Sequence, residues 1–193
     1  MADQASINWQ DNMLARYSII ALSLFVASSG LAEAKTKPAA AQPAASNAPQ
    51  LIKQFDAWGA YSYAQGNSKV CYVLAVPQPN SKLPATVDHG DVYFLVTQRP
   101  GQNISYEPQT MVGYILQASS KVNVTIDDKN FVFFTKDKSA WVENAAEEPA
   151  LVAAMKSGRT MTNTATSKKG TPTSYGFSLK GISSALKQIE TCN

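Results

Sequence analysis

The segment KVNVTIDDKNFVFFT (residues 121–135) decides the fold class. Apolar and polar residues alternate over residues 121–127, as expected for a β-strand with one buried and one exposed face. The apolar members of this alternation are Val122, Val124 and Ile126. Asp128-Lys129 then predicts a turn, and residues 130–135 (NFVFFT) return as the second strand of a hairpin.

Short apolar runs recur on both sides of this hairpin at intervals of about ten residues, with turn residues between them. Further strands are predicted at residues 55–64, 70–76, 91–98, 111–117, 140–143, 160–167 and 173–179. Regularly spaced short strands are typical of an all-β sandwich or barrel. We therefore predict a mainly β domain: an antiparallel β-sandwich or barrel-like fold with two short helices.

Two segments have helical features instead. Residues 147–156 begin with Glu147 and Pro149, which favour a helix start, and Gly158 follows the segment as a helix stop. In residues 182–190 apolar side chains recur at the spacing of one helix face. They are Ile182, Ala185, Leu186 and Ile189. We expect this C-terminal helix to pack on the sheet.

Residues 13–34 (MLARYSIIALSLFVASSGLAEA) have the three parts of a signal peptide. Arg16 supplies the positive charge, a short apolar run follows, and Ala32-Glu33-Ala34 is a small-x-small cleavage site. We expect cleavage between Ala34 and Lys35, and Met13 is an alternative start of the chain. An uncleaved membrane anchor is the alternative, although the apolar run is short for a bilayer span.

Residues 35–50 (KTKPAAAQPAASNAPQ) are rich in proline and alanine and contain nothing that could build a core. This composition predicts a disordered spacer. The predicted organisation is therefore a signal peptide (1–34), a spacer (35–50) and a single β domain (51–193). No stable membrane span is expected after signal cleavage.

The chain has two cysteines, Cys71 and Cys192, and both follow the spacer. An even number of cysteines in an exported domain predicts one disulfide, and two free thiols are the alternative. The disulfide would tie the last helix to an early strand. Neither cysteine belongs to a C-x-x-C pair, which argues against a redox role.

The chain is mildly basic, with a formal net charge of +3. Residues 1–34 hold one basic and three acidic side chains, so their removal raises the net charge to +5. The lysines are scattered, and only Arg99 and Arg159 remain as arginines after cleavage. Nucleic-acid binders usually cluster such residues on one face, so we expect no nucleic-acid partner.

The sequence shows no catalytic, cofactor-binding or metal-binding constellation. The single histidine, His89, lies in VDHGDV, where neighbouring aspartates and glycine favour a turn over a catalytic base. Asp127-Asp128 lacks the ligand spacing of a calcium loop. Ser183 lies in a predicted helix start without a nucleophile motif. We expect no enzymatic activity, no cofactor and no metal site.

Seven tyrosines are candidates for a partner-binding face. They are Tyr61, Tyr63, Tyr72, Tyr93, Tyr106, Tyr114 and Tyr175. At alternate positions of strands such residues more often fill a core or its rim, and the sequence leaves both interpretations open.

A set of short motifs runs through the domain in a fixed order. They are Phe55-Asp56-x-Trp58, Val70-Cys71-Tyr72, Gly113-Tyr114-Ile115-Leu116, Lys138-Ser139-Ala140-Trp141-Val142, Leu151-Val152-x-Ala154-Met155, Tyr175-Gly176-Phe177-Ser178-Leu179-Lys180-Gly181-Ile182, Ala185-Leu186 and Cys192. In this order and spacing, residues 52–192 resemble the invasion-associated locus B family of alphaproteobacterial envelope proteins. The resemblance implies an exported protein linked to host-cell invasion or envelope integrity, and it transfers no catalytic residues.

We therefore expect a non-enzymatic binding or interaction module whose partner is a protein or another envelope component. Its expected location is the periplasm, the outer surface or the medium. The alternative is a periplasmic enzyme or enzyme inhibitor that acts through an exposed loop, such as residues 89–91 or 168–172. A deep pocket with converging polar groups would favour the enzyme, and a flat aromatic face would favour the binding module.

Overall fold

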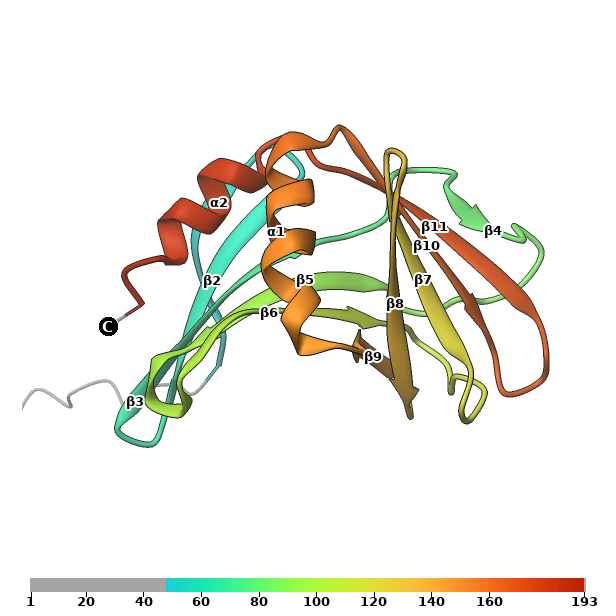
Figure 1. Cartoon of the computed structure of the whole chain (residues 1–193), viewed down its shortest axis with the longest axis horizontal. Helices are drawn as coiled ribbons and strands as arrows, with labels where there is room; N and C mark the ends of the chain where they lie inside the picture. The colour runs from blue at the N-terminus through green and yellow to red at the C-terminus, as the bar shows by residue number, and fades with distance from the viewer. Residues whose placement is uncertain (1–47, 193) are drawn as a thin grey trace, which may run out of the picture. The chain divides into compact units, whose positions relative to one another are not determined.

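The computed structural model describes residues 48–192, in which eleven strands and two α-helices follow one another (Figure 1). The predicted signal peptide, the Ala34–Lys35 cleavage position and most of the spacer lie outside the described residues. The strands are β1 (Gln50–Phe55), β2 (Trp58–Gln65), β3 (Ser68–Ala75), β4 (Lys82–Leu83), β5 (Tyr93–Arg99), β6 (Ile104–Met111), β7 (Lys121–Ile126), β8 (Lys129–Lys136), β9 (Ser139–Val142), β10 (Thr160–Thr166) and β11 (Pro172–Ser178). The helices are α1 (Glu148–Ser157) and α2 (Ile182–Ile189), with short 3-10 turns at Pro100–Gln102 and Ala145–Glu147.

Within residues 48–192 all strands join one antiparallel sheet, in the order β1-β2-β3-β5-β6-β9-β8-β7-β10-β11-β4. β1 and β4 are the edges, so the sheet is open and not closed into a barrel. The sheet nevertheless curls, because the ring of Phe94 in β5 lies 6.1 Å from that of Phe177 in β11 and 6.2 Å from that of Phe133 in β8. The predicted mainly β, antiparallel fold with two helices is therefore confirmed.

Residue alternation gives the sheet an inner and an outer face. In the hairpin of β7 and β8, Val122 pairs with Phe133 and Val124 with Phe131, and all four side chains are buried. They belong to a core that combines the inner faces of the other strands with the apolar faces of both helices. Side chains of the opposite parity point away from this core, and we call their side the outer face.

Both helices pack by the apolar faces that the sequence predicts. The four apolar residues of α2 named above are at most 1% exposed, and α2 contacts β1, β2 and β3. Figure 1 shows α2 beside β2. α1 buries Leu151 and Met155 and contacts β6 and α2. Gly181 precedes α2 with a φ of 93°, and a Cβ atom there would lie 2.1 Å from the carbonyl oxygen of Phe55. Glycine therefore allows α2 to begin directly against the end of β1.

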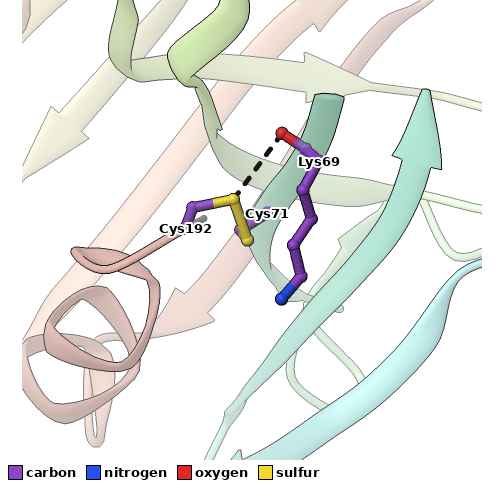
Figure 2. Close-up of a disulfide and its surroundings, with 3 residues drawn as sticks. All are labelled: Lys69, Cys71 and Cys192. Atoms are coloured by element: carbon purple, nitrogen blue, oxygen red, sulfur yellow. Dashed lines mark hydrogen bonds between the residues drawn. A yellow bond between two sulfur atoms is a disulfide. The ribbon is translucent and has the colours of Figure 1, made fainter. Parts of the chain in front are cut away.

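A disulfide joins Cys71 in β3 to Cys192, 121 residues later (Figure 2). Both cysteines are 2% exposed, and Cys192 Sγ lies 3.8 Å from the carbonyl oxygen of Lys69. The bond therefore holds the end of α2 against an early strand, in the place that the sequence predicts.

Two predicted strands differ from the structure. Residues 55–64 are predicted as one strand, but a turn at Asp56, whose φ is 48°, divides the segment between β1 and β2. The predicted strand at 111–117 is wrong because β6 ends at Met111, and Leu116 makes only a single bridge to Ser167.

Strand β6 (Ile104–Met111) overlaps the predicted strands only at Met111, and it contains a proline, Pro108. In the structure Pro108 pairs with Val96 of β5, whereas the pairing of β6 with β9 begins only at Gln109. Proline is tolerated where a strand has a partner on one side only.

Candidate functional site

Four of the seven candidate tyrosines lie together on the outer face of the sheet. Tyr61 and Tyr63 in β2, Tyr72 in β3 and Tyr93 in β5 share the parity that points away from the core. The other three are elsewhere: Tyr106 and Tyr114 pack against the core, and Tyr175 is fully buried in it. Of the two interpretations that the sequence leaves open, core or rim packing therefore applies to Tyr106, Tyr114 and Tyr175, and the other four tyrosines remain candidates for a binding face.

The strand register extends this group into a row that crosses the sheet. Tyr61 pairs with Tyr72, Leu74 with Leu95, and Trp141 with both Gln109 and Phe134. We define the aromatic face as Tyr61, Tyr63, Tyr72, Leu74, Tyr93, Leu95, Met111, Phe134 and Trp141, all of them half-buried except Phe134, which is 41% exposed. The other members of the aromatic face could be identified only from their positions in the strands, where alternate residues point to opposite faces.

The rings of the aromatic face are arranged against one another. Tyr61 stacks on Tyr72 at 5.3 Å between ring centroids, and Tyr63 meets Tyr72 edge-on at 6.3 Å. Phe134 stacks on Trp141 at 5.8 Å. Because these contacts restrict the rings before any partner arrives, the surface is preorganised for binding.

The aromatic face has little net charge. The Arg99 guanidinium donates to Glu107 at 2.7 Å at one margin, and Lys121 pairs with Glu143 at the other. Burial, and then the neighbouring Tyr61 and Tyr63, raise the pKa of the Tyr72 hydroxyl. The hydroxyl therefore stays protonated, and the face offers apolar rings with neutral hydroxyl groups, a composition typical of interface cores.

A second candidate site is a pocket of about 480 Å³ between the loops beside β11. It is lined by Val87, Asp88, Tyr114, Ile115, Ser167, Lys168, Lys169, Thr171 and Thr173. The structure thus brings together the two loops, near residues 89–91 and 168–172, that the sequence left as the alternative site.

Close backbone contacts position these loops. Gly113 N donates to the carbonyl oxygen of His89 at 3.2 Å, and a Cβ atom on Gly113 would lie 2.5 Å from that oxygen. Lys168 N donates to the carbonyl oxygen of Ile115 at 2.8 Å. The Asp88 carboxylate accepts from Gly90 N at 2.8 Å, and Gly90 has a φ of 56°, but residues 88–91 form no backbone hydrogen-bonded turn of the kind predicted. The segment after β6 therefore serves as the bridge between both loops.

A buried chain of hydrogen bonds lies behind the pocket. His89, 6% exposed, contacts the hydroxyl of Tyr175 through Nδ1 at 2.9 Å and the carbonyl oxygen of Pro84 through Nε2 at 3.0 Å. The Tyr175 hydroxyl donates to Tyr114 at 2.9 Å, and Tyr114 lies 2.6 Å from Thr173 Oγ1. Both ring nitrogens of His89 are thus within hydrogen-bond distance of groups in the interior.

Burial, and then the hydrogen bond with Tyr114, raise the pKa of the Tyr175 hydroxyl well above its usual value. Tyr175 therefore remains a neutral hydrogen-bonding group. No pattern in the sequence indicates this chain, because its members come from three separate segments: the loop that carries His89, the segment of Tyr114, and β11.

We predict that Tyr175→Phe lowers the free energy of unfolding by about 1–3 kcal/mol, because the change leaves His89 Nδ1 buried without its partner. Tyr93→Phe is the matched control, since the Tyr93 hydroxyl makes no hydrogen bond within residues 48–192; it should change stability by less than about 0.5 kcal/mol. Chemical denaturation measures both. Equal stability of the two variants would show that the buried chain contributes nothing.

The remaining polar candidates have structural partners. Asp127 accepts from the backbone N–H groups of Arg159 and Thr160, and these bonds, the Thr160 one first, lower its pKa. Ser183 Oγ donates to the carbonyl oxygen of Lys156, which links the two helices. Over residues 48–192, no group of three or more histidine, cysteine, aspartate or glutamate side chains could hold a metal ion.

Comparison with known proteins gives one family. The family model described as Invasion associated locus B (IalB) protein matches residues 58–190, which run from β2 to the end of α2. No curated protein and no solved structure matches the chain.

Proposed function

The chain belongs to the invasion associated locus B family, and on that premise we propose that it is an exported, non-enzymatic envelope protein that binds a partner through its aromatic face. The partner is a protein or another envelope component. The observation that carries this proposal is the presence of two stacked ring pairs on the aromatic face, Tyr61 with Tyr72 and Phe134 with Trp141. Family membership supports a role in host-cell invasion or envelope integrity.

One further observation is compatible with export to the periplasm, the outer surface or the medium. The Cys71–Cys192 disulfide suits an oxidising compartment. Within residues 48–192, neither helix has the length and apolar character needed to cross a membrane. We propose that the segment ending at Ala34 directs this export.

A second candidate function is that of an enzyme or enzyme inhibitor acting at the pocket between residues 87–88 and 167–171. This function is favoured by the pocket, because both loops contribute residues to its lining. Against catalysis, His89 has both ring nitrogens occupied, and Ser167 Oγ accepts from Thr171 N. We therefore propose binding in preference to catalysis.

We predict that Phe134→Ser combined with Trp141→Ser reduces partner capture from envelope extracts by about tenfold or more, because buried aromatic anchors dominate interface energies. The variant should retain the far-ultraviolet circular dichroism of the wild type, since these side chains lie outside the core. Capture is measured with immobilised purified protein and quantitative mass spectrometry.

Leu83→Ser combined with Val87→Ser is the control, because it removes two exposed apolar side chains that do not belong to the aromatic face. It should leave capture unchanged. If only this control loses capture, the pocket and not the aromatic face is the binding surface, and the enzyme or inhibitor function gains support.

A further inference from the structure

The pocket between the two loops has a preformed shape. The turn at 167–171 is closed by Gly170 N donating to the carbonyl oxygen of Ser167 at 2.8 Å and by Thr171 N donating to Ser167 Oγ at 3.1 Å. The buried chain of His89 and Tyr175 supports Tyr114 and Thr173 from behind. A volume of about 480 Å³ is within the range of small-molecule sites.

The charge at the pocket favours an anion. Lys168 and Lys169 are exposed, and among residues 48–192 neither has a carboxylate partner. Asp88 is the opposing charge, and its Oδ1 atom accepts from Gly90 N. The charged lining therefore has one more positive than negative group.

The rest of the lining is divided between apolar and hydroxyl groups. Val87 and Ile115 are 38% and 43% exposed, so apolar surface is available beside the charged groups. The hydroxyls of Tyr114 and Thr173 lie in the wall beside them. A ligand that satisfies all of these groups must carry a negative charge and an apolar portion.

We propose that this pocket binds an amphipathic anion, with a carboxylate or phosphate group at Lys168 and Lys169 and an apolar portion on Val87 and Ile115. This site is separate from the aromatic face, so the inference goes beyond the proposed function and does not rest on it. Charge-assisted hydrogen bonds to the two ammonium groups supply the specificity for the anion.

The test is a titration of the ¹⁵N-labelled purified protein with hexanoate, hexyl phosphate and inorganic phosphate, each to about 10 mM, followed by amide chemical shifts. Hexanoate or hexyl phosphate should shift the amides of Ile115 and Gly170, and the tighter of the two identifies the anionic group. Lys168→Ala combined with Lys169→Ala should weaken that binding about tenfold or more. Asp88→Asn keeps the acceptor for Gly90 N and removes the repelling charge, so it should strengthen binding several-fold.

Lys129→Ala combined with Lys138→Ala is the control for general surface charge, because both lysines are exposed at other turns; it should change the affinity by less than about twofold. An equal loss in this control would overturn the proposal. So would the absence of shifts at the pocket with all three probes, or inorganic phosphate binding as tightly as hexyl phosphate.

Discussion

Replacing Cys192 by serine should lower the free energy of unfolding by about 2–5 kcal/mol. The disulfide closes a loop of 121 residues between β3 and the end of α2, and closing so long a loop removes much of the conformational entropy of the unfolded chain. The loss is a large part of the stability of an ordinary domain. Urea denaturation of the variant and of the wild type measures it.

Cys71→Ser, and the variant that carries both substitutions, should lose the same amount as Cys192→Ser, because each removes the same bond. The wild type should react with alkylating reagents only after reduction. Rapid alkylation of both cysteines in the native protein would contradict the disulfide and this expected loss.

Replacing Leu186 by aspartate should cost more than about 4 kcal/mol and leave the domain largely unfolded at 37 °C. The Leu186 side chain is fully buried between α2 and the sheet. The change removes its apolar contacts and also places an unpaired carboxylate in the core. Differential scanning calorimetry of the purified protein gives the melting temperature.

Lys187→Asp is the matched control, because it introduces the same side chain one position later on the exposed side of α2. It should cost less than about 1 kcal/mol, mainly from a negative charge near the helix C-terminus. Similar melting temperatures for the two variants would mean that α2 does not dock on the sheet in solution.

Sequence patterns predict those strands and helices in which buried residues recur at one regular spacing, every second residue in a strand or every three to four residues in a helix. The hairpin of β7 and β8 and the packed face of α2 agree with the structure for this reason. The disulfide could also be predicted from the sequence, because two cysteines allow only one intramolecular pairing. In contrast, the break at Asp56 needs a left-handed backbone conformation in a non-glycine residue, which propensity disfavours.

The aromatic face was only partly predictable. Alternation within β8 or β9 shows that Phe134 and Trp141 lie opposite the core, but it does not show which strands are neighbours. The pairing of Trp141 with Phe134 and Gln109 depends on the order of strands in the sheet, which long-range contacts decide. Counting tyrosines therefore mixed outer-face residues with Tyr175 of the core.

The pocket could be anticipated only as two separate loops. Turn residues identified the segments around His89 and Lys168, but their meeting depends on Gly113, which allows the loop carrying His89 to approach the segment after β6. Such a contact has no periodic signal in the sequence. The buried position of His89 follows from the same approach, and a turn pattern alone cannot reveal it.

The two edges of the open sheet have a consequence for how the protein meets other molecules. β4 covers only Ser174 and Tyr175 of β11, and β1 has an irregular register between Leu51 and Lys53. A short or bulged edge is a poor template for main-chain pairing, so neighbouring copies have no long straight strand to extend. We therefore expect recognition by this domain to depend on side chains and not on pairing between strand edges.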